Sequence, residues 1–160
     1  MSMIEDSAKR ARFIGSSKEG TVFELTLVAI LLVACGFGFY LAQQCEGPVA
    51  VHFNLKGEVT EWASVKMVYK ELILTAFIAI FVMLCAYSPK SIHLPMRTRT
   101  PRQVALKVRA ARVSALILGF LPLTLAVAMT RQQLAPTIVL VIVLVLVLVF
   151  FSVWIWRART

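Results

Sequence analysis

The sequence is poor in the residues that carry catalytic or metal chemistry. Its 160 residues include two histidines, three cysteines and eight acidic residues, against 17 lysines and arginines. Three cysteines are too few, and odd in number, for a disulfide framework. Only 16% of the residues are charged. Disordered chains combine high charge with low hydrophobicity, so a disordered protein is excluded. Walker, G-x-S-x-G and H-E-x-x-H motifs are also missing, so we predict no enzymatic activity, no metal site and no cofactor.

Long apolar runs are what the sequence has instead. Hydrophobic residues make up 59% of the chain, above the roughly 45–50% of soluble proteins. In lipid the backbone must satisfy its own hydrogen bonds, and the alternating segments of a membrane β-barrel are absent. A helix crosses the hydrocarbon with roughly 20 apolar residues. We therefore predict an all-α bundle of four transmembrane helices, at residues 25–44, 69–88, 113–131 and 137–156.

Basic residues alternate with these runs and predict the orientation of the bundle. Segment 1–24 carries four lysines and arginines, and loop 89–112 carries seven with no acidic residue. Loop 45–68 has two basic residues against three acidic ones. Because lysine and arginine accumulate in short cytoplasmic loops, both termini and loop 89–112 are expected inside. Loop 45–68 is then extracytoplasmic, and segment 1–24 is a cytoplasmic tail.

The net charge of +9 follows from this topology and does not indicate nucleic-acid binding. Basic residues near the surface attract anionic lipid headgroups by about 1 kcal/mol each. An acidic cytoplasmic protein is the other partner that loop 89–112 could attract. The residues predicted to contact lipid are Arg97, Arg99, Arg102, Lys107, Arg109 and Arg112.

Two prolines predict the shape of the third span. Thr100 and Pro101 suit a helix N-cap followed by proline at the first helical position. A basic amphipathic helix is then expected to run on from Arg102 into the membrane. Pro122 lies inside the span and should kink it, because it cannot donate a backbone hydrogen bond.

The interiors of the predicted spans contain no ionisable residue, which disfavours a proton-driven transporter. Their serines and threonines can bond back to a helix carbonyl. Gly36 and Gly38, with Ala34 and Ala42, predict a small-residue surface for close helix packing.

Loop 45–68 is longer than a simple turn needs. Val49, Val51 and Phe53 alternate with other residues, and the stretch from Asn54 to Gly57 predicts a turn. Trp62 suits an anchor at the headgroup level. Two readings remain open for this loop: an anchored structural turn, or a surface that binds a peptide or another partner.

Six residues of the loop carry a family resemblance: His52, Phe53, Asn54, Gly57, Trp62 and Ser64. They resemble the pattern I-P-x-H-F-N-x-x-G-x-x-D-x-W-x-S-K, which lies between the first two transmembrane helices of a bacterial membrane family. The pattern occurs at the N-terminal end of SdpI-type immunity proteins, which protect a producing cell from its own secreted toxic peptide. This chain departs from it at Pro48, Thr60 and Val65.

The resemblance implies a non-enzymatic protein of the bacterial inner membrane with an immunity or envelope-sensing role. The six motif residues would then bind an extracytoplasmic peptide. An alternative is a small transporter or accessory subunit that works as a homo-oligomer. A third hypothesis is a lipid-directed enzyme that uses His52 with Glu58 or Glu61 as acid and base.

Overall fold

The computed structural model describes residues 18–54, 56–88, 101–133 and 135–157. In chain order its elements are α2 (Lys18–Gln43), β1 (Val49–Phe53), β2 (Val59–Ala63), α3 (Lys66–Cys85), α4 (Pro101–Leu118), α5 (Leu121–Arg131) and α6 (Ala135–Arg157). Within these ranges, four helical segments are long and apolar enough to cross a membrane, with α4 and α5 together forming the third. The predicted helical bundle is confirmed, and the chain is a multi-pass membrane protein.

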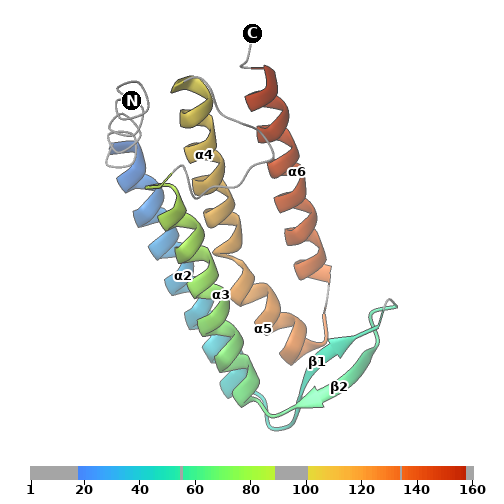
Figure 1. Cartoon of the computed structure of the whole chain (residues 1–160). Helices are drawn as coiled ribbons and strands as arrows, with labels where there is room; N and C mark the ends of the chain where they lie inside the picture. Colours follow the sequence, from blue (N-terminus) through green and yellow to red (C-terminus); the bar gives the residue numbers. More distant parts are fainter. Residues whose placement is uncertain (1–17, 55, 89–100, 134, 158–160) are drawn as a thin grey trace.

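The helices run alongside one another, and the two strands form a hairpin at one end of the bundle (Figure 1). We call this the hairpin end, where α2 finishes at Gln43 and α3 begins at Lys66. The start of α2, the start of α4 and the finish of α6 lie together at the opposite end (Figure 1).

The third span is broken, as the proline predicted. Gly119 and Phe120 form a turn between α4 and α5, and Pro122 occupies the first turn of α5. Gly119 also brings the chain close to α2, because a Cβ there would lie 2.9 Å from Leu27 Cδ1 and 3.0 Å from Ile30 Cγ2. The kink therefore coincides with a point where this span approaches α2 closely.

The helices extend further than their apolar runs. α2 begins at Lys18, so the last part of the segment predicted as a tail is helical. α4 begins at Pro101, as predicted, and residues 101–112 of the basic loop are helical. A helix needs no lipid to continue, and the alternation of basic and apolar residues suits an amphipathic helix at the membrane surface. Thr100, Arg97 and Arg99 lie outside the described residues.

The core contains two larger clusters along the bundle axis and a small one formed by Ala86, Val108 and Ala111. One, at the hairpin end, joins the strands to the helices and contains Ala42, Val49, Val68, Leu72, Ala126 and Met129. The other lies between α2, α3 and α4 and contains Leu27, Leu31, Ala79, Met83 and Ala115.

α6 stands apart from both clusters and packs against α4 and α5 (Figure 1). Only 6% of the residues in its most apolar stretch are buried, against 39% for the α4–α5 span. Most of its surface is therefore available to lipid.

Candidate functional site

The motif loop folds into an antiparallel hairpin. β1 and β2 pair Val49 with Ala63, Ala50 with Trp62, and His52 with Glu61. The turn from Asn54 to Gly57 is thus confirmed, whereas the alternation in β1 is incomplete, because Ala50 is buried as well as Val49. Short strands with irregular register, as seen here on both sides of His52, are marginal on their own and need support from a neighbouring core.

Asn54 builds the turn of the hairpin. Its Oδ1 accepts hydrogen bonds from the backbone N–H of Lys56 at 2.9 Å and of Glu58 at 3.0 Å, and its Nδ2 donates to Glu58 Oε2 at 2.7 Å. Gly57 closes the turn with φ +81°, and its N–H donates to the Asn54 carbonyl at 2.9 Å. Both ends of the Asn54 amide are therefore used within the turn.

The base of the hairpin is buried in the bundle. Val49 is 1% exposed and Ala50 is fully buried, and Val49 belongs to the core cluster formed with α2, α3 and α5. The outer part is exposed: the side chains of His52 and Glu61 are 73% and 65% accessible, and Trp62 is 49% accessible. The hairpin is thus fixed at its base and presents polar and aromatic groups beyond it.

His52 and Glu61 face each other across the strands and are both exposed, with Nδ1 and Oε2 3.3 Å apart. Of the acid–base partners suggested for His52, the fold brings Glu61 to it and commits Glu58 to Asn54. In the described part of the chain, no group of three His, Cys, Asp or Glu side chains is placed to hold a metal ion.

The two remaining motif residues shape the strands. Phe53 is half-buried at the end of β1, opposite Val59. Ser64 precedes α3, and its carbonyl accepts a hydrogen bond from the N–H of Met67 at 2.9 Å. Asn54, Gly57 and Ser64 therefore set the course of the backbone, whereas the side chains of His52 and Trp62 are exposed.

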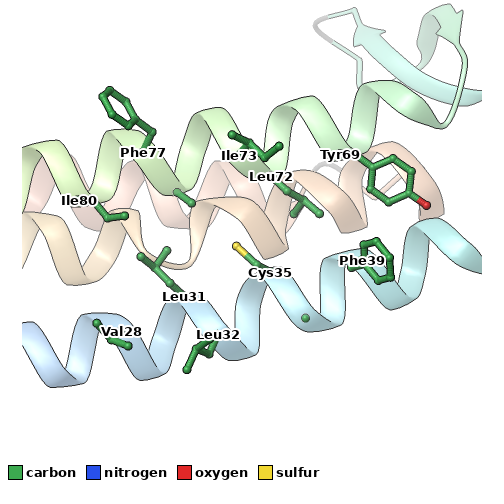
Figure 2. Close-up of a pocket in the computed structure, with 12 residues that line it drawn as sticks. Val28, Leu31, Leu32, Cys35, Phe39, Tyr69, Leu72, Ile73, Phe77 and Ile80 are labelled. Carbon is green, nitrogen blue, oxygen red and sulfur yellow. The ribbon is translucent and has the colours of Figure 1, made fainter.

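An open groove of about 950 Å³ lies between α2 and α3 and starts close to the hairpin (Figure 2). Phe39 and Tyr69 meet across it with ring centroids 5.4 Å apart. Its lining includes three small residues, Cys35 and Gly36 of α2 and Ala76 of α3. The lining is apolar apart from the Tyr69 hydroxyl: Val28, Leu31, Leu32, Cys35, Gly36, Phe39, Tyr69, Leu72, Ile73, Ala76, Phe77 and Ile80.

The two glycines of α2 have different surroundings, and only Gly36 lines the groove. A Cβ at Gly38 would lie 2.6 Å from Leu72 Cδ2 and 3.2 Å from Ala126 Cβ, so this glycine serves packing within the chain. A Cβ at Gly36 would meet nothing within 4 Å. Ala34 and Ala42 are buried, as a helix-packing surface requires, but Gly36 faces the open groove.

A charged cluster occupies the opposite end of the bundle. Arg109 of α4 holds Glu19 of α2 with both Nε and Nη2, at 2.8 and 3.1 Å. Tyr87, just beyond α3, donates a hydrogen bond to Glu24 of α2. This bond to a carboxylate, together with desolvation, raises the pKa of the Tyr87 phenol. The interactions tie α2 to the elements on either side of it.

The predicted lipid-contacting residues of α4 divide into two groups. Arg102 and Arg109 are exposed, as a surface that meets headgroups requires. Lys107 and Arg112 are buried, with 7% and 1% of their surface accessible. The Arg112 guanidinium carbon lies 5.9 Å from the centre of the Phe23 ring, which places this cation inside the helix packing.

Back-bonding satisfies the threonines of the spans, as expected. Thr26, Thr75, Thr124 and Thr130 each donate to a carbonyl three or four residues earlier. Two residues differ: Thr137 donates to the Thr124 carbonyl of α5 at 3.1 Å, and the Oγ of Ser114 is buried and has no hydrogen-bond partner. The sequence did not predict that Ser114 lacks a hydrogen-bond partner or that Lys107 is buried. Both depend on which face of α4 is covered by other segments, which composition does not show.

The arrangement thus offers three features to a ligand: an exposed polar and aromatic hairpin, an apolar groove, and a buried polar face on α4. Comparison with family models finds no match, and neither the curated proteins nor the solved structures contain a significant match.

Proposed function

We propose that this membrane protein recognises a peptide at the outer membrane surface through its hairpin, without catalysing a reaction. The observation that carries the proposal is the division of the hairpin into a buried base and an exposed outer part. A loop that served only to connect α2 and α3 would not need Val49 and Ala50 in the core. Rigid presentation lowers the entropy lost on binding.

The chemistry of the hairpin suggests the kind of peptide. Trp62 provides an apolar ring with one hydrogen-bond donor, and Glu61 provides an exposed carboxylate. Such groups suit a peptide that carries both apolar and basic side chains. The resemblance to the SdpI-type motif supports an immunity or envelope-sensing role in the bacterial inner membrane, with the hairpin end outside.

Photocross-linking in native membranes tests this proposal. A photoreactive residue at position 62 should yield a defined peptide or protein adduct, identified by mass spectrometry. The adduct should disappear in an Asn54→Ala variant, which removes the turn bonds, and persist in Gly47→Ala, where a Cβ meets nothing within 4 Å. Lipid adducts alone, or equal loss of protein in both variants, would contradict the proposal.

The second candidate function is an oligomeric accessory or transport subunit, favoured by the exposure of Gly36 in the groove. Small residues at a helix surface allow another helix to approach closely in lipid. Native-membrane cross-linking should then show an oligomer that Gly36→Leu disrupts. A chain that remains monomeric in membranes and in mild detergent would exclude this candidate.

A further inference from the structure

The groove between α2 and α3 begins at one membrane boundary and has the depth of one lipid leaflet. Tyr69 lines the end nearest the strands, with Phe39 opposite it (Figure 2). On α3, Tyr69 stands between Lys66 and Lys70, which places this end at the boundary, because charged side chains are costly inside the hydrocarbon. Ile80 lines the far end, eleven residues along the same unbroken helix, or about 17 Å away. Half of the hydrocarbon layer is about 15 Å thick.

The two lysines continue the groove face of α3 toward the hairpin end. Lys66 comes seven residues before Ile73, and Lys70 comes seven before Phe77. Ile73 and Phe77 both line the groove, and residues seven apart differ by only about 20° around a helix. Helical side chains also lean toward the helix N-terminus, which for α3 is the hairpin end. The two ammonium groups therefore extend from the mouth of the groove toward the headgroup layer.

Both lysines are available to an anion. Their side chains are exposed, and neither forms an ion pair with another residue in the described part of the chain. Glu71 follows Lys70 in the sequence, but it lies about 160° from Ile73 around α3, on the side away from the groove. The mouth of the groove is therefore basic, and the lining beyond the Tyr69 hydroxyl is apolar.

An acyl chain fits this groove better than a transmembrane helix does. A helix of another chain would cross the whole hydrocarbon layer of about 30 Å. The lining stops at Val28 and Ile80, and beyond them Leu27 and Met83 belong to one core cluster. An acyl chain occupies a single leaflet and ends in a headgroup at the boundary. The groove has the same order of groups, with apolar side chains inside and cations at its mouth.

We propose that the groove binds one acyl chain of an anionic phospholipid, whose phosphate pairs with Lys66 and Lys70. The acyl chain covers Ile73 and Phe77, which are exposed in the isolated chain. The Tyr69 hydroxyl lies between the basic mouth and the apolar lining, at the level of the lipid ester groups. The lipid site is separate from the exposed part of the hairpin and does not depend on the proposed function.

Photolabelling with a lipid probe tests the proposal. The full chain is reconstituted in phosphatidylcholine vesicles that contain a trace of phosphatidylglycerol with a diazirine in one acyl chain. After illumination, mass spectrometry should place the adducts on residues 28–39 and 69–80. α6 is the internal control, because its apolar surface is exposed over most of its length and contacts lipid without a groove. A phosphatidylcholine probe with the same diazirine should label the groove less.

Two variants separate the headgroup contact from the acyl-chain contact. The double variant Lys66→Met with Lys70→Met should lower groove labelling by phosphatidylglycerol roughly tenfold, to the level of the phosphatidylcholine probe. Arg131→Met is its control, since it removes an exposed cation at the hairpin end of α5 and should leave the labelling unchanged.

Gly36→Phe should prevent labelling of the groove by both probes, because the new ring fills space where a Cβ meets nothing within 4 Å. Val33→Phe is its control, because Val33 is exposed on α2 but does not line the groove. Both variants should unfold at the temperature of the parent chain.

Four results would overturn the proposal. Adducts as frequent on α6 as in the groove would show that lipid only surrounds the protein there. Equal labelling by the two probes, or a preference for phosphatidylglycerol that survives in the lysine double variant, would show that the lysines do not select the headgroup. Unchanged labelling in Gly36→Phe would place the acyl chain elsewhere. An oligomer in the same vesicles whose contact covers the groove, without a groove adduct, would assign the groove to a second copy of the chain.

Discussion

The hydroxyl of Tyr87 donates a hydrogen bond to the carboxylate of Glu24, which connects the segment after α3 with the first turns of α2. With the Glu19–Arg109 pair, it closes the end of the bundle that lies farthest from the hairpin. Both contacts join residues that are far apart in sequence, so each of them depends on how the helices are arranged.

Replacing Tyr87 by Phe should lower stability by about 1 kcal/mol, because the Glu24 carboxylate loses a donor. The pKa of the phenol is raised by this bond, so the stabilisation is complete below the ordinary tyrosine pKa of 10.0 and is lost as pH rises through the higher folded value. Unfolding in detergent at neutral and at alkaline pH measures both effects. Tyr40→Phe, which alters an exposed tyrosine, is the control. A parent chain and Tyr87→Phe that are equally stable at neutral pH would contradict this interpretation.

Asn54→Ala should open the hairpin turn while leaving the helices intact. The variant loses the acceptor for the Lys56 and Glu58 amides, at a cost of about 1–2 kcal/mol. Hydrogen exchange should become faster at these two amides and stay unchanged in α2 and α3. Asn54→Asp keeps the acceptor oxygen but places a carboxylate beside Glu58, so its exchange should be intermediate. Uniform acceleration across the bundle would show that the turn supports the whole fold instead.

Gly57→Ala should destabilise the hairpin by about 1–2 kcal/mol, because a residue with a Cβ is strained at φ +81°. Gly47→Ala is the matched control, since a Cβ at that glycine meets nothing and no positive φ is required there. Hydrogen exchange of the hairpin amides measures both changes. Equal effects of the two substitutions would mean that the turn geometry is not what requires Gly57.

Gly38→Ala and Gly36→Ala should have opposite effects on the stability of the monomer. At Gly38 the added methyl group meets Leu72 and Ala126, so the Leu72 side chain must turn aside and α5 must shift slightly, at a cost of about 1–3 kcal/mol. At Gly36 the methyl group enters the open groove, and the higher helix propensity of alanine adds up to about 1 kcal/mol. Denaturant unfolding in detergent compares them. A destabilised Gly36→Ala would point to a contact in the groove from outside the monomer.

The Glu19–Arg109 pair should contribute little to stability despite its two short bonds. Both side chains are about half exposed, with accessibilities of 44% and 52%, and exposed pairs are worth at most about 1 kcal/mol. A double-mutant cycle with Glu19→Gln and Arg109→Gln should give a coupling energy within this range that decreases with added salt. A larger coupling that salt does not reduce would indicate that the pair is shielded from solvent.

The sequence by itself determined the architecture of this protein. Long runs without charge can only be helices in lipid, because the backbone must satisfy its own hydrogen bonds there. The sequence also predicted two local features. Pro122 cannot donate a backbone hydrogen bond, so the third span is kinked near it. Asn54 and Gly57 suit a turn, and the hairpin turn lies there. Each of these outcomes depends on residues close together in the chain.

Only the tertiary structure decided which residues of the same type share a role. Gly36 and Gly38 look alike in the sequence, yet Leu72 packs on one and the other faces the groove. Lys107 and Arg112 read as surface cations, and helix packing buries them, whereas Arg102 on the same helix is exposed. These differences depend on which helix face is covered by segments distant in the chain. In a membrane protein the apolar residues of a helix do not indicate which face packs on another helix. A leucine is as stable against lipid hydrocarbon as it is against a neighbouring helix.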